Sequence, residues 1–327
     1  MKILVTGSAG HLGEALMRTL AGSEHEAIGL DVQASPFTSV VGSIADEHVV
    51  AQAMSGVGAV FHTATLHKPH IVTHTRREFV DTNVVGTLTL LEAAVAQGVA
   101  SFIYTSTTSV FGRALLPEAG APAAWITEDV APVPKNIYGV TKRAAEDLCD
   151  LFHRKHRLPC LILRTSRFFP DSDDDERVRR RYDDENVKVN ESLYRRVDLE
   201  DVVSAHLRAV ERAPALRFGR YIVSATAPFS REHMAELRAD APALLRRFFP
   251  DYVGQYEQRG WAMFPTIDRV YVNDLARTEL GWEPKWSFRY LLDRLAAGED
   301  THSALARAVG FKGYHAGRFR DETYPTE

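Results

Sequence analysis

Short apolar runs alternate with longer helical patterns over roughly the first half of the chain. Runs bounded by turn residues predict buried strands at 3–5, 27–30, 59–62, 101–106 and 160–163. Between them, apolar residues recur at spacings of three and four, which predicts helices near 46–54, 79–95 and 137–156. Strands that alternate with helices predict a parallel sheet covered on both faces, a doubly wound Rossmann-type α/β fold.

Beyond Phe169 the pattern becomes shorter and less regular, and it predicts a smaller, mostly helical part. Helices are expected at 200–212, 231–237, 273–280 and 288–297. We therefore predict a Rossmann domain over 1–168 and a substrate-binding domain over 169–327. A return of the chain to the sheet near 197–225 is the alternative to a clean boundary.

A run of charges follows this change of pattern. Residues 171–176 are almost wholly acidic, and residues 177–181 are almost wholly basic. A solvated loop is the simplest interpretation of such a run. The alternative is a mobile lid over 171–185 whose arginines meet an anionic substrate.

Three glycines, Gly7, Gly10 and Gly13, lie between the first predicted strand and the first helix. A strand, a glycine turn and a helix N-terminus together bind the pyrophosphate of a dinucleotide. Asp31 ends the second predicted strand, where its carboxylate can accept hydrogen bonds from ribose hydroxyls and repel a 2′-phosphate. NAD is therefore favoured over NADP, and an ordinary turn aspartate is the alternative for Asp31.

Tyr138 and Lys142 are four residues apart on one face of a predicted helix. A phenol has a pKa of about 10 and is a poor base near neutrality. A neighbouring lysine and a nicotinamide cation are expected to lower that pKa. Hydroxyls at a strand end, Ser106 and Thr107, could hold the substrate oxygen, although such residues are also common at strand ends.

The composition of the 327-residue chain, with 45% hydrophobic residues and 9% aromatic residues, is typical of a soluble globular protein. The net charge of −4 gives no reason to expect a nucleic-acid or membrane partner. We expect no membrane-spanning stretch and no signal peptide. Cys149 and Cys160 lack metal-site spacing, so no metal and a reduced, cytoplasmic setting are expected.

Together these motifs resemble the extended short-chain dehydrogenase/reductases of the NAD-dependent epimerase/dehydratase group. Residues 6–13 look like the TGxxGxxG turn, 83–87 like the NVxGT helix and 138–142 like the YxxxK pair. The resemblance implies that Tyr138 is the acid/base and that Lys142 binds ribose and lowers the phenol pKa. Aligning 110–112 with the V-Y-G motif makes Thr107 the catalytic hydroxyl, with Ser106 the next candidate.

The resemblance also implies sets of binding residues. The residues expected to bind NAD, besides Tyr138 and Lys142, are Gly7, Ala9, Gly10, His11, Leu12, Gly13, Asp31, Ser43, Ile44, Thr63, Ala64, Thr65, Asn83 and Thr105. The residues expected to meet substrate are His67, Thr108, Ser109, Arg167, Arg195 and Arg196. Members commonly dimerise through two long helices, here 79–97 and 137–156.

The sequence departs from the family pattern in its substrate half. Thr108 and Ser109 stand where dehydratases carry Asp-Glu, which argues against dehydration. Arg167 lies near the usual asparagine of nucleotide-sugar epimerases, and Asp198 replaces a histidine. The arginine that clamps a diphosphate has no clear counterpart in 264–269.

We expect hydride transfer between NAD and a secondary hydroxyl of a carbohydrate-like substrate, with an epimerase that forms a transient ketone as the first hypothesis. A net NAD-dependent dehydrogenase or reductase of a non-nucleotide alcohol or ketone is the alternative. A non-catalytic redox sensor that binds NAD is a minor one. Arg167, Arg195 and Arg196 either meet an acidic group of the substrate or form salt bridges with Asp198 and Glu200.

Overall fold

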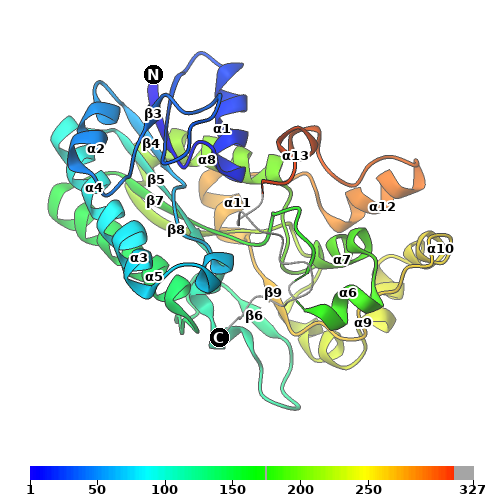
Figure 1. Cartoon of the computed structure of the whole chain (residues 1–327). Coiled ribbons are helices and arrows are strands. Elements are labelled where there is room, and N and C mark those ends of the chain that lie inside the picture. The colour runs from blue at the N-terminus through cyan, green and yellow to red at the C-terminus, as the bar shows by residue number, and fades with distance from the viewer. Residues whose placement is uncertain (174, 313–327) are drawn as a thin grey trace.

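The computed structural model describes residues 1–173 and 175–312, and a seven-stranded parallel sheet forms its centre (Figure 1). The strand order is β3-β2-β1-β4-β5-β7-β8. The bounds are β1 (Lys2–Thr6), β2 (Glu26–Asp31), β3 (Val40–Val41), β4 (Ala59–His62), β5 (Ser101–Thr107), β7 (Cys160–Thr165) and β8 (Phe218–Val223). β1 pairs with β2 on one side and with β4 on the other, so the strand order changes direction between β1 and β4. Open α/β sheets bind ligands at the carboxyl ends of the strands at such a point.

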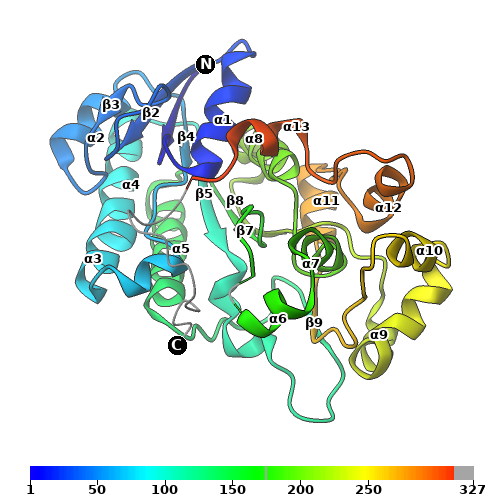
Figure 2. The same ribbon diagram turned by 45° about the vertical axis from the view of Figure 1, so that its right-hand side comes forward.

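Helices cover both faces of this sheet, as predicted. One core joins the sheet to α1 (His11–Ala21), α8 (Leu199–Leu216), α11 (Asp274–Leu280) and α13 (Ala304–Val309). The opposite core lies under α2 (Glu47–Met54), α4 (Gly86–Gln97) and α5 (Ile137–His156). Figure 2 shows these two layers on either side of the strands.

The helix predicted near 79–95 is a composite. It consists of α3 (Arg76–Val80), a single π-helical turn η2 (Asp81–Val85) and α4. Contrary to our expectation, the stretch Arg76–Gln97 is long and apolar enough to cross a membrane by length and composition. Its Leu90, Leu91 and Ala94 are fully buried against the sheet, so the stretch is a core helix of this fold.

The chain does not divide cleanly at residue 168. The helix α8 packs on β5 and β7, and β8 pairs in parallel with β7, so 199–223 belongs to the Rossmann sheet. Conversely, β6 (Ala124–Ile126) lies in the first half and pairs with β9 (Arg269–Tyr271) of the second. The substrate part is therefore built from separate segments that share one apolar core.

The charge run is partly helical, which corrects the prediction of a loop. It contains α6 (Glu176–Arg181), which Asp175 caps by accepting a hydrogen bond from the Arg177 N–H. The helix α7 (Asp184–Glu191) follows directly. The helix α6 buries none of its residues, and its cap and charge pairs stabilise its ends. The helix α7 instead buries Val187 and Val189 in the apolar core of the substrate part.

The remaining elements are short helical turns and three helices of the second half of the chain. The short helical turns are η1 (Lys68–Val72), η3 (Thr108–Phe111), η4 (Arg113–Leu115) and η5 (Arg231–His233). The other helices are α9 (Met234–Phe248), α10 (Tyr252–Glu257) and α12 (Phe288–Ala296). In Figure 2 these three helices lie to the right, on the opposite side of the molecule from α2 and α3.

Candidate active site

The glycine turn after β1 is so closely packed that two of its positions exclude a side chain. Gly7 has φ +72°, and a Cβ there would lie 2.8 Å from the Ala64 nitrogen. A Cβ on Gly13 would lie 1.9 Å from the Gly7 carbonyl oxygen. The turn thus brings the chain close to the N-terminus of α1, whose first N–H groups form a natural anion site.

Asp31 lies at the carboxyl end of β2 beside this turn. Its Oδ2 accepts a hydrogen bond from the Ala9 N–H at 3.0 Å, and its Oδ1 accepts one from the Gln33 N–H at 2.9 Å. These bonds orient the carboxylate and leave lone pairs for ribose hydroxyls. The neighbouring Ile44 is buried under Gly86, whereas the Ser43 hydroxyl accepts a bond from the Ala45 N–H.

The buried His62 links the ends of β1 and α4 by hydrogen bonds. His62 Nδ1 lies 2.8 Å from the Thr6 hydroxyl, and its Nε2 lies 2.9 Å from the Thr87 hydroxyl. Burial, with the charge of Lys142, lowers the pKa of His62 well below its usual value, so the ring is neutral. The Thr6 hydroxyl also accepts from the backbone N–H groups of Thr63 and Ala64, which fixes the segment after β4.

Asn83, in the π-helical turn, ties that segment to α5. Its Oδ1 accepts hydrogen bonds from the Leu66 N–H at 2.8 Å and the Thr65 hydroxyl at 2.9 Å. Its amide nitrogen donates to the Thr141 hydroxyl at 3.0 Å. In the π turn the Asn83 side chain reaches both the segment 65–66 and Thr141. Such turns often occur at functional sites.

Tyr138, Lys142 and Thr107 meet at the junction of α5 and β5. Asn136 caps α5, and Tyr138 and Lys142 are both buried on one face of the helix. The Thr107 side chain hydrogen-bonds the Tyr138 phenol. The Lys142 ammonium donates to the Thr105 carbonyl at 2.6 Å, whereas the Thr105 hydroxyl turns away to His206.

In the polypeptide alone, burial is the largest effect on the pKa values of Tyr138 and Lys142. It raises the pKa of Tyr138 to about 12, against the lowering effect of the Thr107 hydrogen bond. It lowers the pKa of Lys142 to about 7, against the raising effect of Glu146. The predicted lowering of the phenol pKa by Lys142 is therefore not present in the chain itself. A cationic nicotinamide beside the phenol would supply the opposing charge.

Of the two hydroxyl candidates, only Thr107 contacts the phenol. Ser106 points to the other side of β5 and donates to Glu146 Oε1 at 2.6 Å, so its role is structural. The Ser109 N–H donates to the Thr107 hydroxyl at 3.1 Å and so orients it. Thr108, the neighbouring substrate candidate, is buried.

An aromatic wall borders the phenol, and of its members the sequence analysis named His67 and His11 but missed Phe168 and Phe169. The His67 ring lies 6.1 Å from the Tyr138 ring and 5.4 Å from the Phe169 ring, measured between centroids. Phe169 stacks on Phe168 at 4.3 Å and lies 5.7 Å from His11. Burial lowers the pKa of His67 to about 3 and that of His11 to about 4, so both rings are neutral. The one signal in the sequence for the missed part of the wall was the aromatic pair Phe168 and Phe169 shortly after the strand β7.

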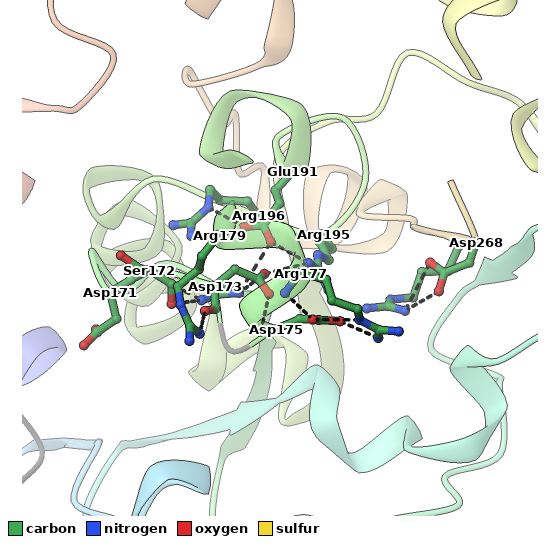
Figure 3. A network of polar contacts seen from close by, with 12 residues as sticks. Asp171, Ser172, Asp173, Asp175, Arg177, Arg179, Glu191, Arg195, Arg196 and Asp268 are labelled. Carbon is green, nitrogen blue, oxygen red and sulfur yellow. Dashed lines mark hydrogen bonds and ion pairs between the residues drawn. The ribbon is translucent and has the colours of Figure 1, made fainter. Parts of the chain in front are cut away.

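The three candidate arginines gather around Glu191 and Asp173. Figure 3 shows Arg195 and Arg196 beside Glu191. Arg195 Nη2 lies 2.6 Å and Arg196 Nε lies 2.8 Å from the Glu191 carboxylate. Arg167 Nη1 donates to Asp173 at 2.8 Å. Burial raises the pKa of Glu191, but the arginines outweigh it and hold that pKa below its usual value.

These ion pairs correct one of our two interpretations of the arginines. Asp198 and Glu200, the expected salt-bridge partners, serve elsewhere. Asp198 caps α8 by accepting from the Glu200 N–H, and the Glu200 carboxylate accepts from the Trp286 indole. Within 1–173 and 175–312, no group of three or more His, Cys, Asp or Glu side chains is arranged to hold a metal ion.

The chain is similar to known proteins in sequence and in fold. A model of the NAD dependent epimerase/dehydratase family matches residues 3–223. The chain is 25% identical over 327 residues to a UDP-glucose 4-epimerase of Rhizobium leguminosarum bv. trifolii, a match that covers 89% of this chain and 94% of the epimerase. A short-chain dehydrogenase/reductase superfamily protein of Agrobacterium tumefaciens with bound NAD shares the fold, with a TM-score of 0.63 and 24% identity over 91% of this chain and 96% of that one.

A shorter match points to another kind of relative. The chain is 34% identical over 155 residues to a 2-alkyl-3-oxoalkanoate reductase of Stenotrophomonas maltophilia. This match covers 45% of the chain and only 44% of the reductase, so the chain spans less than half the length of that relative.

Proposed function

Because the chain belongs to the NAD dependent epimerase/dehydratase family, we propose that it oxidises a secondary hydroxyl of a carbohydrate-like substrate by hydride transfer to NAD. It is an NAD-dependent enzyme of the extended short-chain dehydrogenase/reductase type. The observation that carries the proposal is the contact of the Tyr138 phenol with Thr107, one helical turn from the buried Lys142. The glycine turn and Asp31 fit the pyrophosphate and the adenosine ribose of NAD.

Each residue at the junction has a distinct task in the reaction. The Thr107 hydroxyl holds the substrate oxygen, and Tyr138 removes its proton as the carbon–hydrogen bond breaks. NAD, when bound, accepts the carbinol hydrogen as hydride. The Thr105 carbonyl holds the Lys142 ammonium one helical turn from Tyr138. The neutral His67 and Phe169 exclude water from the side of the phenol that they border. Tyr138 returns the proton when the ketone is reduced again.

An epimerase is the first candidate for the overall outcome. Such an enzyme would release a product that differs from its substrate only in the configuration of one carbon, with no net consumption of bound NAD. The match with a UDP-glucose 4-epimerase over 94% of its length supports this outcome. This support rests on overall similarity alone, because proteins of one fold carry out several different reactions.

A net dehydrogenase of a non-nucleotide alcohol is the second candidate, and one specific observation favours it. Arg167, Arg195 and Arg196 already bind the carboxylates of Glu191 and Asp173. Drawing them towards a diphosphate would weaken the ion pairs of a buried carboxylate, at a cost of about 3–5 kcal/mol for each pair broken. The partial likeness to a reductase supports the same candidate.

We also propose that the enzyme is a cytoplasmic homodimer. Apolar side chains remain exposed on α3, on the π turn and on α5, among them Val80, Val85 and Val140. These helices adjoin one another and offer a continuous face to a second copy. Cys149 and Cys160 are free and buried, in keeping with a reducing compartment.

The deciding experiment compares wild type with Tyr138→Phe on a panel of sugars, sugar acids and hydroxy acids in the presence of NAD. NADH absorbance that depends on substrate would identify a dehydrogenase, whereas isomer formation without NADH would identify an epimerase. The variant should lose about 10²–10⁴-fold in rate while still binding NAD. Equal rates for the two proteins would remove Tyr138 from the mechanism.

A further inference from the structure

An apolar cavity of about 220 Å³ lies beyond the aromatic wall, between the Rossmann sheet and the substrate part. Phe168 and Phe169 form one side of it, and Val189 of α7 and Leu291 of α12 form others. We propose that this cavity binds an apolar group, such as a short acyl chain or one ring, at the remote end of the substrate. The inference rests on the hydride transfer proposed above and names the class of molecule that undergoes it.

The charged side chains around the cavity are already bound to other groups. Lys188 donates to the Pro170 carbonyl and to Asp184. Arg196 binds Glu191 and the Phe169 carbonyl, while Arg307 binds Asp300 and the His302 carbonyl. A diphosphate would have to compete with these partners, whereas an apolar group would leave all of them in place.

The size of the cavity indicates which chemical group it can enclose. A cavity of about 150 Å³ lined by apolar side chains holds benzene, and pockets for drug-sized ligands begin near 300 Å³. A volume of about 220 Å³ therefore suits a group somewhat larger than one benzene ring. A whole nucleotide is too large for the cavity to enclose.

Phe169 connects the cavity to the reacting groups. Its ring lines the cavity and also packs edge-on against His67, which in turn borders Tyr138. A substrate whose hydroxyl lies at Tyr138 and Thr107 would reach the cavity by passing this ring. His67 and His11, on the same wall, are neutral and so place no charge beside an apolar chain.

The test measures binding and oxidation of 2-alkanols from 2-butanol to 2-octanol by the NAD-loaded enzyme, with uridine diphosphate as a competitor. Binding is followed by calorimetry and oxidation by NADH absorbance in the same samples. We expect the dissociation constant to fall about fourfold for each added methylene until the cavity is full. Uridine diphosphate should not displace 2-octanol.

Two substitutions fill the cavity and one serves as their control. Ala306 lines the cavity, so Ala306→Trp should abolish the dependence on chain length, and the smaller change Ala306→Leu should shorten the optimal chain. Ala297 is exposed at the end of α12, and Ala297→Trp should leave the series unchanged. Thermal unfolding of all three variants identifies any that fails to fold.

The outcomes separate the two hypotheses. Affinity that does not depend on chain length, absence of binding, or displacement by uridine diphosphate would each overturn the apolar site. Binding that depends on chain length, with no NADH and no isomer from any alkanol or from the panel of sugars, sugar acids and hydroxy acids, would support the cavity and count against the proposed function. Oxidation that does not depend on chain length would support the proposed function and count against the apolar site.

Discussion

Arg164 and Glu146 form a bidentate ion pair in the interior of the protein, with Arg164 Nε and Nη2 donating to the carboxylate oxygens at 3.0 and 2.7 Å. Both side chains are at most 1% exposed, and the Ser106 hydroxyl donates to the same carboxylate. Arg164 lies on β7, Ser106 on β5, and Glu146 on α5 one turn beyond Lys142. The pair therefore joins the elements that carry the reacting groups.

Glu146 is accordingly predicted to be a positioning residue for Lys142 and Thr107. Glu146→Gln removes the charge that pairs with buried Arg164 and should lower the free energy of unfolding by about 3–5 kcal/mol. Glu26→Gln is the matched control, because the pair of Glu26 with Lys2 is exposed and its loss should cost less than about 1 kcal/mol. Denaturant unfolding of both variants measures the difference.

A pH profile distinguishes this role from a purely structural one. The Glu146 carboxylate raises the pKa of Lys142, which burial lowers to about 7. Without that carboxylate the pKa falls further, so the ammonium persists only at lower pH. The alkaline limb of the activity profile should move towards lower pH in Glu146→Gln. A uniform loss of rate with an unmoved limb would contradict the assignment.

The second prediction separates the two strand-end hydroxyls. Thr107→Ala removes the group that contacts Tyr138 and should lower kcat/KM by about 10²-fold, whereas Thr107→Ser should retain most of the activity. Ser106→Ala removes only a hydrogen bond to Glu146, so it should lower stability by about 1–3 kcal/mol and largely preserve kcat. A larger loss of kcat in Ser106→Ala than in Thr107→Ala would exchange their roles.

The third prediction concerns the choice between the two dinucleotides. Asp31→Asn should weaken NAD binding roughly 10- to 100-fold, because a carboxylate that accepts ribose hydrogen bonds is lost. Binding of NADP should improve relative to NAD, since the 2′-phosphate no longer meets a negative charge. Asp46→Asn, at the N-cap of α2, is the control and should leave both affinities unchanged. Calorimetric titration with each dinucleotide measures the ratio.

The fourth prediction follows from the buried neutral histidines. Burial lowers the pKa of His206 from 6.5 to about 4, so between these pH values the unfolded chain binds a proton that the folded chain does not. Folding stability should therefore fall as the pH decreases from 6.5 to 4, by up to about 1.4 kcal/mol per pH unit for each such histidine. His11 and His67 contribute in the same direction.

Two variants isolate the contribution of one ring. His206→Gln should make the decline in unfolding free energy shallower by up to about 1.4 kcal/mol per pH unit. His48 is exposed, and His48→Gln should leave the slope unchanged. Urea unfolding at pH 6.5, 5.5 and 4.5 provides the slopes, and identical slopes for wild type and His206→Gln would show that this ring is not the group that titrates.

The elements that could be predicted from the sequence are those with local signals. The helix α5 begins after the cap Asn136 and ends at Arg157, which has a positive φ, so the prediction of 137–156 agrees with its bounds. The strand β4 (Ala59–His62) was likewise predicted with its observed bounds. The glycine turn was recognisable because only glycine fits where the backbone packs against itself.

The rest depends on contacts between distant residues or on features without periodicity. The π turn at 81–85 is hidden because apolar residues keep their spacing through it. The wall forms where Phe168 and Phe169 meet His67 and His11, which lie far away in the sequence. The pairs of Arg195 and Arg196 with Glu191 join residues only four and five positions apart, but no helix was predicted at 184–191 and this spacing was not recognised. The helix α6 lies in a charge run and has no apolar periodicity from which it could be predicted.

The last prediction tests the proposed dimer. Val140 and Leu151 are 50% and 38% exposed, and eleven residues bring them to the same face of α5 after three turns. Val140→Glu would bury an unpaired carboxylate in the contact, so it should raise the dimer dissociation constant by at least about 100-fold. Val41, on the edge strand β3, is 57% exposed, and Val41→Glu should leave the dimer intact. Sedimentation velocity over a range of concentrations measures both. A wild-type protein that sediments as a monomer, or a Val140→Glu protein that still dimerises fully, would rule out this face.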